Sequence, residues 1–229
     1  MQNIFKEIVY HLICPVCVRC GSFQVSTQFF CKNCLEVFLI PQLQKTTTST
    51  HYGVEVHSFL MWTPWQSDSL SEFVYLLKSR TSQSAWAWIV KQIQDEICMI
   101  IGSSDSVLFI PVPGSRRSFH TDFFSCEIQQ LLGGQRKSAL WHKSANLGPQ
   151  KSKIRADRKR VEFIFDEEFT QDISSADHII LIDDIYTTGS TMAAAAMAIK
   201  SELKLNGRHH TKISGLVLFR RDKSIMSEQ

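Results

Sequence analysis

The 229-residue sequence has no apolar run long enough to cross a membrane, and its formal net charge is only +3. It also lacks two common nucleotide-binding patterns, Gly-Lys-Ser/Thr in a glycine-rich loop and Gly-x-Gly-x-x-Gly after a strand. Residues 1–13 place Lys6, Glu7 and His11 among apolar residues at helical spacing, which indicates a short amphipathic helix and not a signal peptide. We therefore expect a cytoplasmic protein without membrane insertion.

Strand and helix patterns alternate along most of the chain, which predicts an α/β fold with a mostly parallel sheet flanked by helices. We expect helices at 71–78, 85–101, 122–132 and 192–205, and strands at 107–113, 161–165, 179–182 and 213–219, with a short strand at 138–142. Residues 41–53 are polar and lack periodicity, which indicates a linker. We divide the chain into an N-terminal helix and ribbon (1–45) and a main domain (46–229).

Five of the seven cysteines lie between residues 14 and 34, and without an export signal this favours metal binding over disulfides. Two Cys-x₂-Cys pairs can close a tetrahedron of thiolates around a structural Zn²⁺. We assign the ligands to Cys17, Cys20, Cys31 and Cys34, because Gly21 follows the first pair. Cys14 competes for this role, since Cys14 and Cys17 have the same spacing. The alternative is a small core of reduced thiols.

The most informative stretch runs from Ile179 to Thr191. Four branched apolar residues predict a buried strand, and Asp183 and Asp184 follow at its carboxyl end. The next turn and the start of a helix contain five small residues, Thr187, Thr188, Gly189, Ser190 and Thr191. Hydroxyls and free N–H groups at a helix N-terminus suit a phosphate, while the carboxylates suit sugar hydroxyls or a Mg²⁺ that the ligand brings. A ribose 5-phosphate combines these groups. The alternative is an ordinary cap by Ser190 or Thr191 beside two solvated acids.

Two other segments suit polyanions. The strand that ends at Pro111-Val112-Pro113 is followed by Gly114, Ser115, Arg116 and Arg117, and small residues with arginines at a strand end suit a second phosphate group. Residues 136–160 contain nine Lys/Arg and one acid, so this stretch has a charge of +8 and the remainder +3 − 8 = −5. We expect residues 143–160 to form a basic flexible loop. Trp62, Trp65, Trp86 and Trp88 form either a stacking surface for nucleobases or, as we prefer, packing in the core.

The stretch from Ile179 to Thr191 resembles the phosphoribosyl-pyrophosphate (PRPP) signature of type I phosphoribosyltransferases. This resemblance implies a phosphoribosyltransferase-like sheet in which Asp183 and Asp184 contact the ribose hydroxyls at the catalytic site. It also implies that Thr187, Thr188, Gly189, Ser190 and Thr191 hold the 5-phosphate of PRPP, which is bound with Mg²⁺. Pro113, Gly114, Ser115 and Arg116 would then form the pyrophosphate loop.

The order of a cysteine ribbon, Lys78-Ser79-Arg80, Pro-Val-Pro, a basic loop and the PRPP signature resembles ComF/GntX-type phosphoribosyltransferase-domain proteins. The stretch from Gln150 to Arg158 resembles the flexible hood of that family. Its basic residues, with the two that follow, are the expected hood and nucleic-acid contacts: Lys151, Lys153, Arg155, Arg158, Lys159 and Arg160. One stretch differs from the family pattern, since residues 119–123 read Phe-His-Thr-Asp-Phe where the family has Arg-Gly-Phe-Asn-Gln.

The resemblance implies a role in DNA uptake during natural transformation. We rank first a cytoplasmic accessory protein that binds PRPP or a related ribose phosphate and incoming single-stranded DNA, together with other DNA-uptake proteins. The alternative is an active phosphoribosyltransferase of nucleobase or nucleotide salvage, which attaches a nucleophile at ribose C1 and releases pyrophosphate. Such catalysis depends mainly on positioning and electrostatic stabilisation, so the sequence need not contain a recognisable general base.

Overall fold

The structure is a computed structural model, and it describes residues 16–23, 29–63, 68–79, 83–113, 120–137, 163, 165 and 167–221. Several expectations from the sequence lie outside these residues. They are the N-terminal helix, Cys14, Trp65, the pyrophosphate loop from Gly114 to Arg116, the strand at 138–142 and the basic loop at 143–160.

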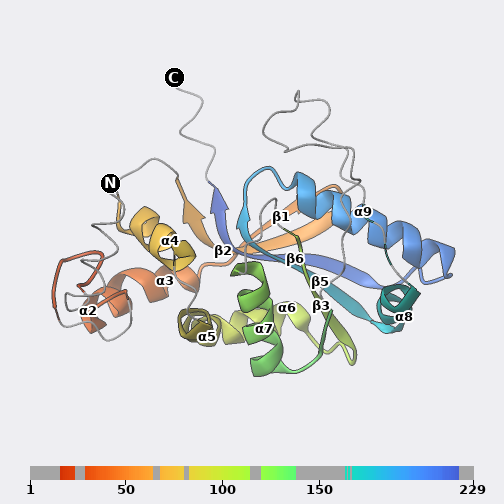
Figure 1. The fold of residues 1–229 in the computed structure, drawn as a ribbon, viewed down its shortest axis with the longest axis horizontal. Helices are drawn as coiled ribbons and strands as arrows, with labels where there is room; N and C mark the ends of the chain where they lie inside the picture. Colours follow the sequence, from red (N-terminus) through yellow and green to blue (C-terminus); the bar gives the residue numbers. More distant parts are fainter. Residues whose placement is uncertain are drawn as a thin grey trace, which may run out of the picture.

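A six-stranded sheet forms the centre of the protein (Figure 1). Its strands are β1 (Thr47–His51), β2 (Val54–Trp62), β3 (Val107–Pro111), β4 (Gln135–Arg136), β5 (His178–Tyr186) and β6 (Lys212–Arg221). The spatial order is β1-β2-β6-β5-β3-β4, with β1 antiparallel to β2 and every other neighbouring pair parallel. The predicted α/β class with a mostly parallel sheet is therefore confirmed.

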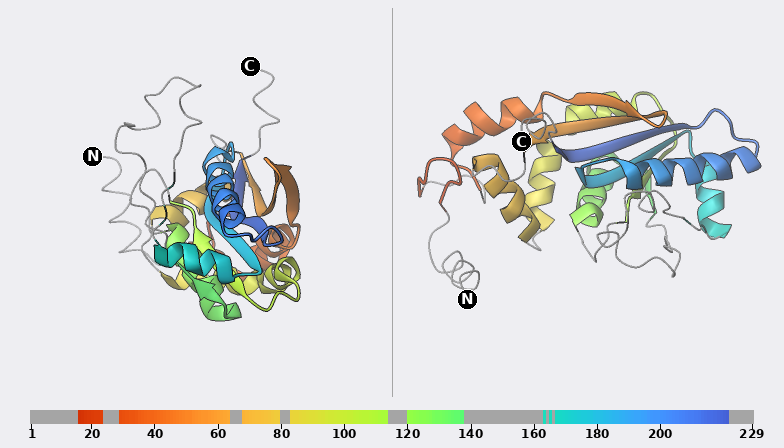
Figure 2. Two further views of the ribbon diagram at one scale, coloured as in Figure 1. Left: turned by 90° about the vertical axis from the view of Figure 1, so that its right-hand side faces the viewer. Right: turned by 90° about the horizontal axis from the view of Figure 1, so that it is seen from above.

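Helices cover both faces of the sheet (Figures 1 and 2). One face packs against α4 (Ser69–Ser79), α5 (Gln83–Gln92), α6 (Gln94–Ile101) and α7 (His120–Leu132), through a core that includes Phe73, Trp86, Ile97 and Phe124. The other face packs against α8 (Glu167–Ser175) and α9 (Ser190–Leu205). Ile180 and Ile182 of β5 point to the first core, while Ile179 and Leu181 point to the second. This alternation follows from the two-residue side-chain period of a strand.

The expected linker at 41–53 is wrong, because its threonines form the edge strand β1. Threonine is β-branched and pairs readily in a sheet, so its polarity does not exclude a strand. Tyr52 and Gly53 both have positive φ, 52° and 69°, and form the two-residue turn of the β1–β2 hairpin. The expectation of one helix at 85–101 is also wrong, since buried Ile93 leaves helical geometry with φ −113° and ψ 15° and separates α5 from α6.

Several further elements were not assigned from the sequence, and β2, β4 and α8 are among them. Of the expected strand at 161–165, the structure describes Phe163 and Phe165, which lie outside its helices and strands and pack partly against the core beneath α9. The helices at 71–78, 122–132 and 192–205 and the strands at 107–113, 179–182 and 213–219 are confirmed, with ends that differ by up to four residues.

The cysteine-containing segment shares its core with the main sheet. It continues through α2 (Lys32–Cys34), a π-helical turn (Leu35–Leu39) and α3 (Ile40–Leu43). The ring of Phe73 in α4 lies 5.2 Å from Phe29, 5.3 Å from Phe30 and 6.0 Å from Phe219 of β6, measured between centroids. Phe73 therefore joins the two parts by edge-to-face aromatic contacts. The division near residue 45 stays a prediction.

Among the described residues, no helix combines the length and apolar character needed to cross a membrane.

Candidate functional site

The carboxyl ends of β3 and β5 meet where the strand order changes direction. β3 and β5 are neighbours, but the strand that follows β3 lies on one side of the pair and the strand that follows β5 lies on the other. In open α/β sheets this switch point is where ligands bind. Asp183 and Asp184 lie in the carboxyl-terminal part of β5, and Pro113 lies just after β3. The Val112 N–H donates to the Ile182 carbonyl at 2.7 Å, so Pro113 and the two acids lie at the carboxyl ends of neighbouring strands.

The two acids are not solvated side chains. Asp184 is 8% exposed, and its Oδ2 lies 2.6 Å from Nζ of Lys78 in the last turn of α4. Asp183 is half-buried, and its Oδ1 accepts a 2.8 Å hydrogen bond from the Asp184 backbone N–H. Burial, together with the nearby Asp184 carboxylate, raises the pKa of Asp183 well above its usual value. The pair therefore combines one acid that is paired with a cation and one for which ionisation is unfavourable.

The turn after β5 presents small polar groups to solvent. Thr187 and Thr188 are exposed, and the Thr188 and Ser190 hydroxyl oxygens lie 3.0 Å apart. Gly189 is the N-cap of α9 with φ 72°, and no side chain caps the helix at this residue. Ser190 begins the helix and Thr191 follows it, so the alternative of a cap by one of them is wrong. The Ser190 N–H donates to the Thr188 hydroxyl oxygen at 3.4 Å. The first N–H groups of an α-helix have no partner within the helix, so the following ones can be offered to an anion.

His120 and Arg220 adjoin the site, and sequence reasoning did not identify either. His120 begins α7, and its ring stacks on buried Trp86 with centroids 6.1 Å apart. Burial lowers the pKa of His120, while Asp184 acts in the opposite direction. Arg220 pairs in register with Tyr186 at the ends of β6 and β5, and its guanidinium carbon lies 5.8 Å from the Tyr186 ring centroid. A cation therefore lies next to Tyr186, the residue that leads into the turn after β5.

Lys78 is also a site residue that the sequence did not predict. Lys78-Ser79-Arg80 contributed to the family resemblance, but Lys78 was not assigned to the site. A helix with a lysine in its last turn is common, and no local signal says which acid that lysine will meet. The contact with Asp184 depends on how α4 packs against the sheet. The signal that could have found His120 was its position shortly after the β3 strand, since loops at that edge reach the site.

The tryptophans belong mainly to the core. Trp62 and Trp86 are buried, Trp88 is half-buried, and the indole Nε1 of Trp62 donates to Ser71 Oγ at 3.1 Å. These three residues therefore do not form an open stacking surface, and the interpretation as core packing is confirmed for Trp62 and Trp86.

The four predicted cysteines form one cluster. The sulfur atoms of Cys17, Cys20, Cys31 and Cys34 all lie within 4.8 Å of one another, and those of Cys20 and Cys31 are 3.7 Å apart. Tetrahedral Zn–S bonds of about 2.3 Å place two sulfurs about 3.8 Å apart, so the spacing fits a structural metal such as zinc. Gly21 after the first pair has φ 72°, as its proposed role in the turn requires.

The same cluster has divided thiol acidities. Burial acts to raise the pKa of Cys17, but hydrogen bonds from the backbone of Cys31, Cys20 and Arg19 outweigh it and lower that pKa to about 6. Burial and the neighbouring cysteines raise the pKa of Cys34 to about 12. Without a metal, one thiol of the crowded group ionises readily, and its negative charge opposes ionisation of its neighbours. A bound cation would stabilise all four as thiolates.

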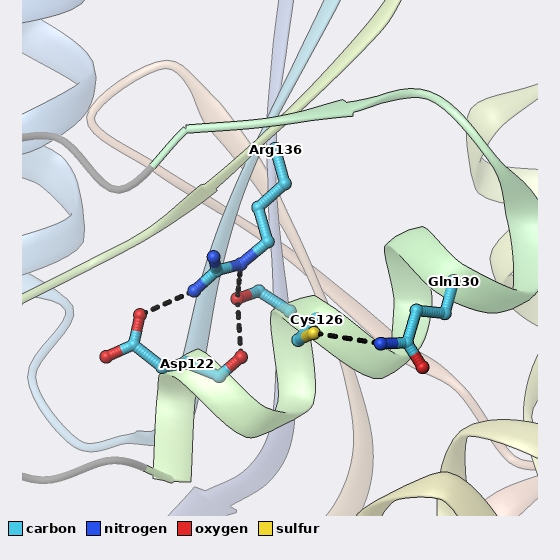
Figure 3. A network of polar contacts seen from close by, with 5 residues as sticks. Asp122, Cys126, Gln130 and Arg136 are labelled. Carbon is cyan, nitrogen blue, oxygen red and sulfur yellow. Dashed lines mark hydrogen bonds and ion pairs between the residues drawn. The ribbon is translucent and has the colours of Figure 1, made fainter.

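The first two cations of the basic stretch, Arg136 and Lys137, are already paired, and Figure 3 shows the contacts of Arg136. Arg136 donates to Asp122 at 2.6 Å and to Ser125 at 2.8 Å, and Lys137 lies 2.6 Å from Glu168 and 2.9 Å from Asp172. These contacts tie β4 to α7 and α8. Of the nine Lys/Arg counted from 136 to 160, 9 − 2 = 7 remain, and all seven lie outside the described residues.

We compared the chain and its fold with known proteins. No family model matches the sequence, and no curated protein matches it either. A solved structure with some similarity is the crystal structure of TT1426 from Thermus thermophilus, at 14% identity and a TM-score of 0.29, over 59% of this chain and 81% of that chain. That overlap is too slight to assign a function.

Proposed function

We propose that the site at the carboxyl ends of β3 and β5 binds PRPP with Mg²⁺. We also propose that the protein is a ComF-like cytoplasmic factor that handles incoming single-stranded DNA during natural transformation. One observation carries the ligand proposal: two acids and a hydroxyl-rich helix start follow one another at the switch point of a parallel sheet. A ribose phosphate carries a diol and a monoester phosphate on one small molecule, which suits acids and hydroxyls that lie next to each other in the chain.

Each part of the site has a role in this proposal. Thr187, Thr188 and the start of α9 receive the 5-phosphate, because they offer hydroxyls and backbone N–H groups. Asp184, which is paired with Lys78, accepts a hydrogen bond from one ribose hydroxyl. Asp183 has a raised pKa, so in its protonated form it can donate a hydrogen bond to the other. Mg²⁺ would bind to oxygens of the ligand beside these acids, since Mg²⁺ keeps few protein ligands in phosphate sites.

The cysteine cluster has a structural role in the proposal, with Zn²⁺ as its metal. Four thiolates leave no open coordination position for chemistry. The cluster packs in the same core as Phe29, Phe30 and Phe73, so the metal would fix the N-terminal segment against the sheet.

The role in DNA handling rests on the sequence resemblance and on the basic residues between 143 and 160. With Arg136 and Lys137 engaged in ion pairs, phosphate contacts would come from the remaining seven cations. Other DNA-uptake proteins are the expected protein partners.

A second candidate is an active phosphoribosyltransferase, which is favoured by the acidic pair directly before the phosphate turn. In that reaction a nucleophile forms a bond to ribose C1, and the bond from C1 to pyrophosphate breaks with its electrons leaving on the pyrophosphate. Asp183 and Asp184 would hold the sugar while positive charge develops at C1. The two candidates share the ligand site and differ in turnover.

Calorimetry with PRPP and Mg²⁺ tests the ligand proposal. The pair of substitutions Asp183→Ala and Asp184→Ala should weaken binding at least about tenfold, because both sugar contacts are lost. The matched control is Asp105→Ala, an exposed acid before the amino end of β3. Unchanged affinity in the double variant would contradict the proposal. Release of pyrophosphate with added nucleobases, and binding of a labelled oligonucleotide, then separate the enzyme from the accessory protein.

A further inference from the structure

Lys78 places a positive charge directly on the acidic pair. Its Nζ lies 2.6 Å from Oδ2 of Asp184, whose side chain is 11% exposed, while the Lys78 side chain is 34% exposed. Lys78 comes from the last turn of α4 and Asp184 from β5, so the contact is made by tertiary packing. A buried carboxylate needs such a partner, because an isolated charge at this depth is costly. The ammonium occupies the position that a small cation would take beside this oxygen.

The surroundings of the pair add no further ligand set. Across the described ranges, Cys17, Cys20, Cys31 and Cys34 form the only group of three or more His, Cys, Asp or Glu side chains placed to share a metal ion. Besides Asp183, His120 of α7 acts electrostatically on Asp184 and Lys78, and its lowered pKa leaves it uncharged at neutral pH. Asp183, Asp184 and Lys78 thus determine the local charge. Two carboxylates without further oxygens make a weak Mg²⁺ site.

We propose that Lys78 is a built-in counter-ion that keeps free divalent cations away from Asp184, so that a metal enters this edge of the sheet only with oxygens supplied by its ligand. The identity of that ligand rests on the proposed function, but the exclusion of free cations does not. A site of this kind distinguishes a metal-bound sugar phosphate from the metal alone. Lys78 is then a selectivity residue that acts through Asp184.

The proposal predicts that neutralising Lys78 creates a cation site. Lys78→Gln keeps a hydrogen-bond donor for Asp184 and removes the charge, and Lys78→Met removes both. With the zinc-loaded protein, Mn²⁺ binding followed by electron paramagnetic resonance should strengthen at least about tenfold in Lys78→Gln, because a repelling charge at contact distance is gone. Adding Asp184→Asn to Lys78→Gln should abolish the gain. Lys91→Gln, at an exposed lysine in the last turn of α5, should leave Mn²⁺ binding unchanged.

Equal Mn²⁺ binding by the parent protein and Lys78→Gln would overturn the proposal. Circular dichroism establishes that each variant is folded. A test without any change at Lys78 uses the parent protein and Asp184→Asn: if the parent binds free Mn²⁺ and Asp184→Asn loses it, Lys78 does not exclude cations and the proposal is wrong. PRPP binding is measured separately. A parent protein that binds no PRPP contradicts the proposed function but leaves the Mn²⁺ comparison fully informative.

Discussion

The hydroxyl of Tyr186 occupies the space in which a β-carbon on Gly189 would lie. The ring carbon Cε2 of Tyr186 would be 2.7 Å from that β-carbon, and the ring itself is buried at 3% exposure. Gly189 therefore has two separate reasons to be glycine, a left-handed φ of 72° and the approach of Tyr186. This close packing fixes the turn that leads into α9.

Gly189→Ala should destabilise the protein more than Gly207→Ala. The two glycines have φ of 72° and 71°, but a β-carbon at Gly207 would meet nothing within 4 Å. Gly207→Ala should cost about 1 kcal/mol for backbone strain, and Gly189→Ala about 2–4 kcal/mol, since overpacking adds about 1–3 kcal/mol. Urea unfolding of both variants measures the difference. Equal free energies of unfolding would mean that Tyr186 moves aside without cost.

Cys31→Ser should release the metal of the cysteine cluster and lower the melting temperature. Cys31 is buried and is one of four sulfurs that lie within 4.8 Å of one another, so its loss leaves an incomplete ligand set. Elemental analysis should find one zinc per chain in the parent protein and much less in the variant. Cys98→Ser is the control, because Cys98 is exposed, lies in α6 and does not belong to the cluster. Full zinc content in Cys31→Ser would refute the assignment.

Acid should weaken the fold through His178. This residue is 0% exposed, its Nε2 lies 2.8 Å from Ser214 Oγ, and burial, aided by Lys212, lowers its pKa from 6.5 to about 4. Between these values the unfolded chain binds a proton that the folded protein does not, so stability falls as the pH drops from 6.5 to 4. At about 1.36 kcal/mol per pKa unit, the contribution is about 3 kcal/mol.

His178→Gln isolates this contribution, since glutamine keeps a partner for Ser214 and does not titrate. Its free energy of unfolding should fall about 3 kcal/mol less than that of the parent protein over the same pH range. The comparison is made variant against parent because Asp183, whose pKa is raised, has the opposite pH dependence. His209→Gln, at an exposed histidine, should follow the parent curve. Identical curves for His178→Gln and the parent would contradict the role of His178.

Binding of single-stranded DNA should depend steeply on salt. If a few of the seven remaining cations between 143 and 160 contact about three to five phosphates, log K should fall with log[salt] at a slope of about −2 to −3.5. Replacing Arg155, Arg158, Lys159 and Arg160 with alanine should flatten that slope and abolish transformation in a competent host. The Asp183→Ala and Asp184→Ala pair should leave it unchanged. Undetectable DNA binding by the parent protein at low salt would favour the enzyme instead.

The strongest sequence predictions concerned residues whose neighbours along the chain determine their environment. The apolar run from Ile179 to Ile182 predicted a buried strand, and Gly189 predicted a turn. The two Cys-x₂-Cys pairs predicted one shared metal site. The ends of β5 differed, because the strand continues through both acids to Tyr186. A hydrophobic pattern alone cannot show that the polar residues at the carboxyl end of β5 still pair with β6.

The failures share one cause, since each depends on a packing or pairing partner that the local sequence pattern does not show. Thr47 to Thr50 form a strand because β2 pairs with them, and their polar side chains hide this tendency. Lys78 meets Asp184 only after α4 packs on the sheet. The sequence favoured core packing for Trp86 over a stacking surface, but it could not show the partner, which is Phe124 of α7 at 5.7 Å between ring centroids. Composition does not contain this information.

The sheet order also constrains when the protein can fold during its synthesis. β2 emerges from the ribosome early, yet within the described sheet it is joined to β5 and β3 only through β6, at residues 212–221. Until β6 is made, the β1–β2 hairpin and the β3–β5 pair remain separate pieces, each with an exposed strand edge. Such non-local pairing slows folding and prolongs exposure to aggregation. The nascent chain is therefore expected to need protection by chaperones until translation has passed β6.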